Sequence, residues 1–467
     1  MVIRSINPTT EEMLAEFEEF TTEQVDTVLS KAQHAFEQWH RTSFDERAAL
    51  MRRAVSFLRQ HKERLAGLIT AEMGKPIVEA EAEIEKCAWT GDFYAEHAAR
   101  FLADEPVVTN ARESFVAFEP LGTILAVMPW NFPFWQVFRF ALPALMAGNT
   151  AVLKHASNVS QCALAIEEVF RESGFPQGTF RTLLVTSSAV EGIIRDPRIA
   201  AVTLTGSEAV GSMVARTAGE ALKKTALELG GSDPFIVLAD ADLDGAVEFA
   251  VRSRFQNGGQ SCISAKRFIV VEEVAEAFEH RLAVVTGRLR VGDPTRRETQ
   301  MGPMARGDLR DELDRQVRES VQQGARILQG GKSLGDTGYF YAPTVLVNVQ
   351  PTMVAFQEET FGPIAAVVRV RDAEEAIAVA NASIYGLGGN LWTRDIERGK
   401  QLARRIESGS VFINGMTASD PRLPFGGVKR SGYGRELSSF GIREFVNIQT
   451  IWVGPAQATA PAPPDGE

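Results

Sequence analysis

Residues 1–100 carry apolar positions at helical spacing. Thr21 followed by Gln24, and Ser43 followed by Glu46, are the residue pairs of a capping box, in which the first helical turn and its cap satisfy each other's polar groups. Apolar residues then recur with a helical period after each pair. The pattern predicts an amphipathic helix after each cap, and we expect the whole of this segment to be helical.

From Leu121 the pattern changes to short β-rich apolar runs separated by polar or helical segments. A first series reads LGTILAVM, TAVLK, RTLLV, AAVTLT and TALEL, and a second reads PFIVL, RFIVV and GPIAAVVRV. Continuous apolar strands that alternate with helices are typical of a parallel sheet buried on both faces. We therefore predict an α/β fold, with a domain boundary near Gly230–Gly231, where the first series ends.

The end of the chain contains one more apolar run, FVNIQTIWV at 445–453. This run suits either an edge strand at an oligomer interface or an ordinary core strand. Residues 456–467 are rich in Pro and Ala, which predicts disorder. The most apolar stretch, 123–153, contains three prolines and Arg139, so we interpret it as buried core and not as a membrane span.

Composition excludes several classes of protein. The chain has 467 residues, enough for roughly three domains, and 45% of them are hydrophobic. A net charge of −11 disfavours nucleic acid and anionic membranes as partners. Three cysteines are too few for a disulfide framework, the histidines show no ligand spacing, and we expect no metal. The N-terminus has no apolar signal segment, so we expect a reducing, cytoplasmic setting.

Four segments carry candidate chemistry. Cys262 lies in NGGQSCIS, where small neighbours leave room for a substrate to reach a partly ionised thiol, although a buried structural cysteine would also suit this position. Glu228, in TALELGG, and Glu359, in QEETFGPI, are acids beside apolar strands. Such an acid either takes part in catalysis or binding, or lies on a solvated face of the protein. TGSEAVG at 205–211 joins a strand to a helix, as phosphate sites do. Cys87 and Cys162 lie at helical core positions.

Six motifs occur together in one order. They are PWNFP at 129–133, LTGS at 204–207, LELGG at 227–231, NGGQSC at 257–262, EETFGP at 358–363 and PFGGVKRSGYGRE at 424–436. In this combination the chain resembles the aldehyde dehydrogenase superfamily from about Asn7 to Val453. The resemblance implies an α/β, three-layer architecture with a Rossmann-like cofactor domain, an α/β catalytic domain and a small β element for oligomerisation.

The resemblance also implies domain bounds and an assembly. The dinucleotide-binding domain would comprise 1–107 and 121–230, and the catalytic domain 231–432. The oligomerisation element would comprise 108–120 and 433–454, and a disordered tail 455–467. The partners would be a small aldehyde and further copies of the chain, in a homodimer or homotetramer.

Catalytic roles follow from the matched motifs. The Cys262 thiolate would attack the aldehyde carbon, and the Asn131 amide with the Cys262 N–H would hold the resulting oxyanion. After hydride transfer, Glu228 would activate the water that hydrolyses the thioester. The residues implied in cofactor binding are Pro129, Trp130, Lys154, Ser157, Gly206, Ser207, Leu229, Glu359 and Phe361.

Two departures from the family pattern bear on the expected cofactor and on redox control of Cys262. Many members read KPSE where this chain reads KHAS, so Ser157 replaces an acid that would repel a 2′-phosphate beside Lys154. We therefore expect NADP⁺ to be preferred and NAD⁺ to be accepted. Near Cys262, Ser264 stands where some relatives carry a second cysteine, so a redox-controlled disulfide is not expected there.

The expected substrate tunnel also departs from the common pattern. Gln136 and Arg139 share one helical face, and Ser419 and Phe425 lie in MTASDPRLPFGG. A guanidinium there suits a carboxylate at the far end of the substrate, and the alternative is that Arg139 pairs with a structural acid such as Glu358.

The combination of KHAS with DPRLPFGG is similar to the short bacterial succinate semialdehyde dehydrogenases. We therefore expect oxidation of succinate semialdehyde to succinate. The rival interpretations are a dehydrogenase with broad specificity for other short or aromatic aldehydes, a CoA-acylating enzyme, which the presence of Glu228 disfavours, and a non-catalytic protein that retains the fold.

Overall fold

The N-terminal part of the molecule is largely helical, as its periodicity predicts. A computed structural model describes residues 2–454. Both capping boxes are confirmed: the Gln24 N–H donates to Thr21 Oγ1 (3.3 Å), the Thr21 N–H donates to Gln24 Oε1 (2.8 Å), and Ser43 and Glu46 form the same motif. The long helices of this part are α1 (Thr22–Trp39), α2 (Phe44–Gln60), α3 (Lys62–Met73) and α4 (Ile77–Phe101).

One expectation for this part was wrong. Residues 2–18 form an antiparallel hairpin of β1 (Val2–Ile6) and β2 (Met13–Glu18), not a helix. In β1 only the alternate residues Ile3 and Ser5 are buried, the period expected of a strand. Two buried positions are too short a run to stand out as a pattern in the sequence. The tail predicted to be disordered, 455–467, lies outside the described residues.

The first strand series forms a six-stranded sheet in the order β19-β9-β8-β5-β6-β7, parallel except for β19. Its strands are β5 (Thr123–Met128), β6 (Thr150–His155), β7 (Phe180–Thr182), β8 (Ile199–Thr205), β9 (Lys224–Glu228) and β19 (Gly432–Tyr433). Its helices are α5 (Trp135–Met146), α6 (Ser160–Glu172), α7 (Val190–Arg195) and α8 (Glu208–Glu220), with short 3₁₀ turns at Ser157–Val159 and Ser187–Ala189.

Alternate residues of β5 show that both faces of this sheet are covered. Ile124 and Ala126 pack in a cluster with α4 and α5, whereas Leu125 and Val127 pack in a cluster with α1, α7 and α8. The result is the three-layer arrangement predicted for a parallel sheet. Strand order reverses at β5, since β6 lies on one side of it and β8 on the other, and ligands bind at such reversals in α/β sheets.

The second series forms a seven-stranded sheet in the order β12-β13-β14-β11-β10-β16-β17. Its strands are β10 (Asp233–Val237), β11 (Ala265–Val271), β12 (Arg326–Gln329), β13 (Thr344–Val347), β14 (Ile364–Val370), β16 (Asn390–Trp392) and β17 (Phe412–Ile413). Its helices are α9 (Leu243–Phe255), α10 (Glu272–Thr286), α11 (Gly307–Gln322), α12 (Val354–Gln357), α13 (Ala373–Asn381) and α14 (Ile396–Ala403). The chain crosses from the first sheet to this one between β9 and β10, the segment that contains Gly230 and Gly231.

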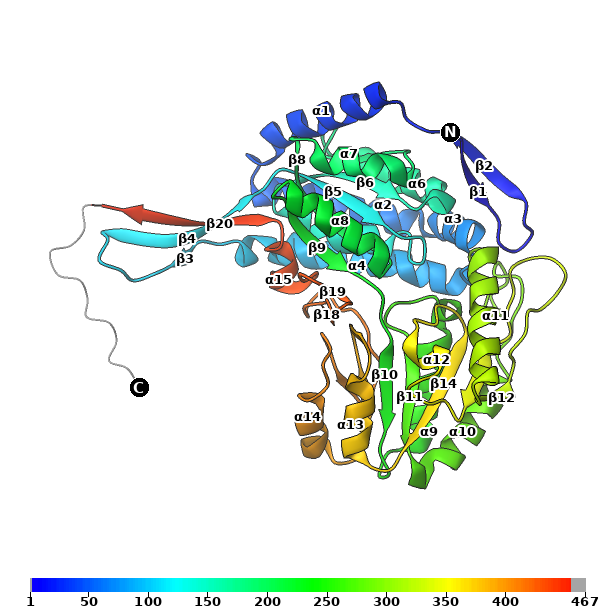
Figure 1. The fold of residues 1–467 in the computed structure, drawn as a ribbon. Coiled ribbons are helices and arrows are strands. Elements are labelled where there is room, and N and C mark those ends of the chain that lie inside the picture. The colour runs from blue at the N-terminus through cyan, green and yellow to red at the C-terminus, as the bar shows by residue number, and fades with distance from the viewer. Residues whose placement is uncertain (1, 455–467) are drawn as a thin grey trace.

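A third, three-stranded sheet projects from the body of the molecule (Figure 1). It contains β3 (Glu105–Pro106), β4 (Glu113–Pro120) and β20 (Val446–Val453), and β20 pairs antiparallel with β4 at one edge. Ile448 and Trp452 of β20 are 65% and 50% exposed. The run at 445–453 is therefore an edge strand and not a core strand. Of the remaining short elements, β15 (Tyr385–Gly386) pairs antiparallel with β18 (Val428–Lys429), and α15 (Ser438–Ile442) packs against α4 and α5.

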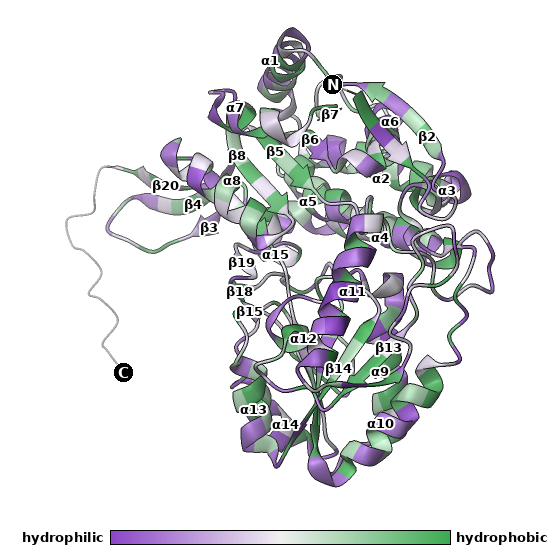
Figure 2. Cartoon of the chain, turned by 45° about the vertical axis from the view of Figure 1, so that its right-hand side comes forward, coloured by the Kyte–Doolittle hydropathy of each residue, from purple (hydrophilic) through white to green (hydrophobic). Residues whose placement is uncertain are grey.

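The apolar stretch 123–153 lies at the centre of the first core. Every residue of α5 within it is buried, including Gln136 and Arg139. The hydropathy colouring agrees, with green strands such as β5 and β8 inside and a mainly purple α11 at the surface (Figure 2). Among residues 2–454, no helix combines the length and the apolar character needed to cross a membrane.

A buried ion pair fixes the loop that follows β5. Glu83 of α4 pairs with Lys75, and Glu83 Oε1 accepts hydrogen bonds from the backbone N–H groups of Phe134 (2.9 Å) and Trp135 (3.0 Å). The Lys75 ammonium also lies 3.8 Å from the centre of the Phe132 ring. A carboxylate at the start of α5 satisfies N–H groups that have no partner within the helix. Through Glu83, α4 therefore holds the segment that begins with Asn131.

We predict that Glu83→Ala lowers the free energy of unfolding by about 3–5 kcal/mol, because it leaves the Lys75 charge buried without its partner. The matched control is Glu85→Ala, also on α4, which removes an exposed ion pair with Arg59 of α2 and should cost less than about 1 kcal/mol. Urea unfolding followed by far-UV circular dichroism measures both. Equal losses in the two variants would contradict the role given to Glu83.

Candidate active site

Cys262 lies in a tight turn between the 3₁₀ segment Gln256–Gly259 and β11. Asn257, Gly258 and Gly259 all have positive φ (56°, 61° and 73°), which glycine adopts without strain. A Cβ on Gly259 would also lie 2.5 Å from the carbonyl oxygen of Gly362. The glycine pair before Cys262 therefore makes this turn possible, and the half-buried thiol lies at its end.

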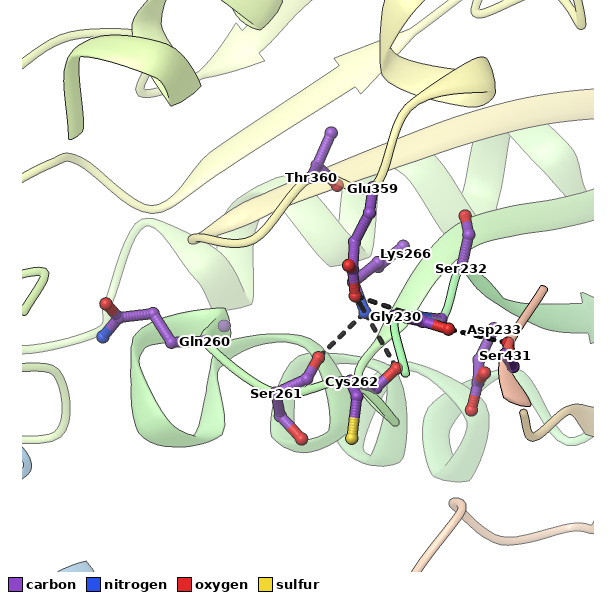
Figure 3. A network of polar contacts seen from close by, with 12 residues as sticks. Gly230, Ser232, Asp233, Gln260, Ser261, Cys262, Lys266, Glu359, Thr360 and Ser431 are labelled. Carbon is purple, nitrogen blue, oxygen red and sulfur yellow. Dashed lines mark hydrogen bonds and ion pairs between the residues drawn. The ribbon is translucent and has the colours of Figure 1, made fainter. Parts of the chain in front are cut away.

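A buried lysine outside the six motifs stabilises the turn through hydrogen bonds to its backbone carbonyl groups. Lys266 Nζ donates to the carbonyl oxygens of Ser261 (2.8 Å) and Cys262 (2.9 Å), and it pairs with Glu359 Oε1 at 3.2 Å (Figure 3). Its position inside an apolar strand directly after NGGQSC was the available signal, since a buried charge needs a partner.

The Gly230–Gly231 pair packs against the same network. The Gly231 N–H donates to Glu359 Oε1 at 2.9 Å. A Cβ on Gly231 would lie 2.5 Å from the Cys262 carbonyl oxygen, and one on Gly230 would lie 2.5 Å from Glu359 Oε2. The two glycines therefore allow the β9–β10 connection to approach both the Cys262 turn and the carboxylate of Glu359.

Asn131 and Cys262 are brought together by hydrogen bonds between their two loops. Asn131 Nδ2 donates to the Gln260 carbonyl oxygen (3.1 Å), and Asn257 Nδ2 donates to the Asn131 carbonyl oxygen (2.8 Å). A side-chain amide has two N–H groups, so one remains for a ligand. The Cys262 N–H donates to no other described group. Both donors implied for the oxyanion are thus available.

Glu228 ends β9 and is 3% exposed. Neither of its carboxylate oxygens has a hydrogen-bond partner among residues 2–454. Burial raises the pKa of Glu228 to about 8, and the positive charge of Arg139 opposes this rise only in part. A carboxyl group with this pKa takes up or releases a proton near neutral pH, as an acid–base catalyst must.

Cys262 opens onto a cavity of about 260 Å³ that contains all four predicted substrate residues. Gln136, Arg139, Ser419 and Phe425 line it together with Phe132 and Trp135. The Gln136 Oε1 atom is buried and has no partner within the described chain. Two further cations, Lys86 and Arg252, also line this cavity, and neither belongs to the six motifs.

The structure gives Arg139 a protein carboxylate as its partner. Arg139 is 2% exposed and pairs with buried Glu436, and its guanidinium carbon lies 4.6 Å from the centre of the Phe425 ring. The structural alternative named Glu358 as the partner, which was wrong, because Glu358 pairs with Arg315 at 2.6 Å. Arg139 therefore lines the cavity, as a substrate contact would, and also forms a buried ion pair, with a different acid from the one expected.

Most of the implied cofactor residues lie at the carboxyl edge of the first sheet. Pro129 and Trp130 follow β5, Gly206 and Ser207 follow β8, and Leu229 follows β9. Ser207 caps α8 without a side-chain hydrogen bond, so the first N–H groups of this helix are free to receive an anionic group such as a pyrophosphate. These residues fit a dinucleotide.

The other cofactor residues lie in two places. Phe361 meets Trp130 edge-on, with 5.8 Å between ring centres. Lys154 and Ser157 line a separate cavity of about 610 Å³ together with Arg306. Arg4 and Asp308 also line this cavity, where Arg306 pairs with Asp308 and Arg4 with Glu16. The Lys154 ammonium and the Ser157 hydroxyl are therefore the groups left to receive a phosphate. Across residues 2–454, no group of three or more His, Cys, Asp or Glu side chains could hold a metal ion.

Comparison with known proteins agrees with the geometry. Residues 1–451 match the model of the aldehyde dehydrogenase family. The chain is 51% identical to the probable succinate-semialdehyde dehydrogenase [NADP(+)] of Synechocystis sp., over 97% of this chain and 100% of that one. It is 50% identical to the succinate semialdehyde dehydrogenase [NAD(P)+] Sad of Escherichia coli, over 96% of this chain and 97% of that one.

A solved structure gives the same result for the fold. The succinic semialdehyde dehydrogenase from Streptococcus pyogenes, in complex with NADP⁺, has a TM-score of 0.95 and 38% sequence identity, covering 97% of this chain and 100% of that one. The predicted α/β fold with a Rossmann-like part and a catalytic part is confirmed.

We predict that iodoacetamide modifies Cys262 alone in the native protein, slowly at pH 7. Burial raises the pKa of Cys262 to about 12, so its thiolate fraction, and with it the rate, should rise about tenfold per pH unit from pH 7 to 9. Cys87 and Cys162 are fully buried and serve as internal controls. Peptide mass spectrometry measures the rate at each site. A Cys262 rate that levels off near pH 7 would contradict the prediction.

Proposed function

This chain belongs to the aldehyde dehydrogenase family, and from that premise we propose that it oxidises succinate semialdehyde to succinate, with NADP⁺ preferred and NAD⁺ accepted. The observation that carries the proposal is the cavity beside Cys262. Its aromatic walls suit a short carbon chain, and cationic side chains on its lining suit a carboxylate at the far end of that chain.

In the proposed reaction, the Cys262 thiolate attacks the aldehyde carbon and forms the carbon–sulfur bond. Burial raises the pKa of Cys262, and the positive charges of Arg139 and Lys266 oppose this rise and so favour the thiolate. The free N–H groups of Asn131 and Cys262 receive the oxyanion. A bound NADP⁺ would supply the acceptor for the hydride that leaves the substrate carbon, and a thioester on Cys262 would remain.

Glu228 performs the second half of the reaction. Its carboxylate accepts a proton from the water that attacks the thioester carbon, the carbon–sulfur bond breaks, and succinate and the Cys262 thiol are released. The absence of any hydrogen-bond partner for Glu228 among the described residues supports this role, because the side chain has no contact to give up when it engages water.

The cofactor would lie across the carboxyl edge of the first sheet. Ser207 and the start of α8 would hold its pyrophosphate, and Lys154 with Ser157 its 2′-phosphate. Glu359 and Phe361 would hold the nicotinamide end, and the Glu359 carboxylate is already positioned by Lys266 and the Gly231 N–H. The first sheet would then be the core of the dinucleotide-binding domain and the second that of the catalytic domain.

Setting and assembly are part of the same proposal. The free thiols of Cys87, Cys162 and Cys262 support a reducing, cytoplasmic compartment. The exposed edge strand β20 supports a homo-oligomer in which a second copy covers Ile448 and Trp452.

A broad-specificity aldehyde dehydrogenase is the second candidate. It is favoured by one observation, the ion pair between Arg139 and Glu436, which leaves the cavity with less net positive charge than its lining suggests.

We predict that wild type has the higher kcat/KM with NADP⁺, and that Ser157→Glu lowers this value at least about tenfold, because a carboxylate would face the 2′-phosphate. The same variant should raise kcat/KM for NAD⁺, whose ribose hydroxyls can donate to the new acid. The control Ser157→Ala removes only a hydroxyl and should lower the NADP⁺ value by less than about tenfold. Initial rates with both cofactors measure this, and a wild-type preference for NAD⁺ would refute the cofactor assignment.

We predict that hydrolysis of the thioester limits turnover at saturating substrate, so that the steady-state rate rises with pH and levels off above about pH 8, because Glu228 must lose its proton to act as a base. Glu228→Gln should slow this rate by about 10²- to 10⁴-fold and still give one equivalent of NADPH in a rapid burst, since only hydrolysis is blocked. Cys262→Ala should abolish both phases. Stopped-flow absorbance at 340 nm separates the two phases, and a Glu228→Gln variant without the burst would contradict the assignment.

A further inference from the structure

Lys86 of α4 directs its ammonium toward the cavity beside Cys262. Its Nζ atom donates to Ser419 Oγ at 2.7 Å and lies 4.3 Å from the centre of the Trp135 ring. The side chain is half-buried and makes no ion pair with any described residue. An ammonium with one hydroxyl partner still has two N–H groups to donate.

The other two cations of the cavity lack this combination. Arg139 is buried, but its charge is balanced by Glu436. Arg252 has no ion pair within the described chain, but it is exposed, and water screens an exposed charge. Lys86 is therefore the cation of this cavity that is both withdrawn from water and without a carboxylate partner in residues 2–454.

The acids nearest to Lys86 are already engaged. Glu83 pairs with Lys75, and Asp420 pairs with Arg422 at 2.5 Å. Burial, and then the repulsion of Arg139, lowers the pKa of Lys86 to about 8, so the ammonium is present at neutral pH but is poorly stabilised by the protein. An anion that enters the cavity would supply the missing stabilisation.

We propose that Lys86, together with the Ser419 hydroxyl, binds the carboxylate at the far end of the aldehyde and sets the preference for carboxylated substrates. This inference rests on the proposed function and assigns its specificity to one side chain. The Ser419 oxygen accepts the Lys86 hydrogen bond, so its own hydrogen is free to point at the carboxylate. The aromatic rings of Trp135 and Phe425 line the cavity for the carbon chain in between.

The experiment compares succinate semialdehyde with butyraldehyde, which has the same number of carbons and no carboxylate. The full chain is assayed with NADP⁺ as wild type, Lys86→Met, Lys86→Gln and Lys86→Arg, with Arg252→Gln as the matched control from the same cavity. The readout is the ratio of kcat/KM for the two aldehydes. A ratio cancels losses of active protein, so a partly unfolded variant still reports on specificity.

Lys86→Met and Lys86→Gln should each lower the ratio by about 10- to 100-fold, mainly through KM for succinate semialdehyde, as expected for the loss of a hydrogen bond to a charged group. Lys86→Arg should keep most of the ratio, and Arg252→Gln should lower it by less than about threefold. A fourth substitution, Arg139→Met, tests the rival contact.

The outcomes separate the inference from the function it rests on. A wild-type ratio near one would refute the substrate proposal itself. A high wild-type ratio that survives both neutral Lys86 variants, or that falls only in Arg139→Met or Arg252→Gln, would overturn the role of Lys86 and leave the substrate proposal standing.

Discussion

The cost of burying charge organises the region around Cys262. Three ion pairs lie there at low exposure: Lys75 with Glu83, Lys266 with Glu359, and Arg139 with Glu436. Each pair also fixes one part of the site. The Lys75–Glu83 pair fixes the loop with Asn131, the Lys266–Glu359 pair fixes the Cys262 turn, and the Arg139–Glu436 pair fixes the wall of the cavity. Removing one partner from such a pair leaves a charge that neither water nor protein stabilises, so the pairs must persist together with the fold. Two ionisable groups that face the same region, Glu228 and Lys86, have no such partner among the described residues.

The strand order explains why these groups meet although their sequence positions are far apart. Parallel strands end at one edge of a sheet, and the order reverses at β5, so the segments after β5, β8 and β9 converge there. The second sheet begins directly after Gly230–Gly231 and contributes the Cys262 turn before β11. Small residues at this junction let backbone pass within contact distance of the turn and of Glu359. The reacting groups thus come from two sheets, and the glycine pair sets how closely those sheets approach.

The capping boxes, the strand series and the six motifs could be predicted from the sequence, because each depends only on residues that are close to one another along the chain. The β1–β2 hairpin was missed because only Ile3 and Ser5 of β1 are buried, too few to reveal a period. The partners of charged side chains could not be predicted in the same way. Lys86 and Ser419 are 333 positions apart, and Arg139 meets an acid in the last motif, so nothing near either residue in sequence indicates the contact. Such pairs are consequences of the tertiary fold.

The pairing of Arg139 changes what its charge contributes. A guanidinium has one positive charge, and a buried carboxylate beside it neutralises most of the field that a substrate would feel at a distance. That charge still acts on the groups closest to it. It opposes the rise that burial causes in the pKa of both Cys262 and Glu228, while Glu436 raises the pKa of Glu228. Arg139 therefore acts on both the nucleophile and the base, and Glu436 opposes its effect at Glu228. One guanidinium cannot balance both Glu436 and the carboxylate of the substrate. Recognition of the substrate carboxylate therefore requires a separate cation, and in this cavity that cation is the Lys86 ammonium beside Ser419.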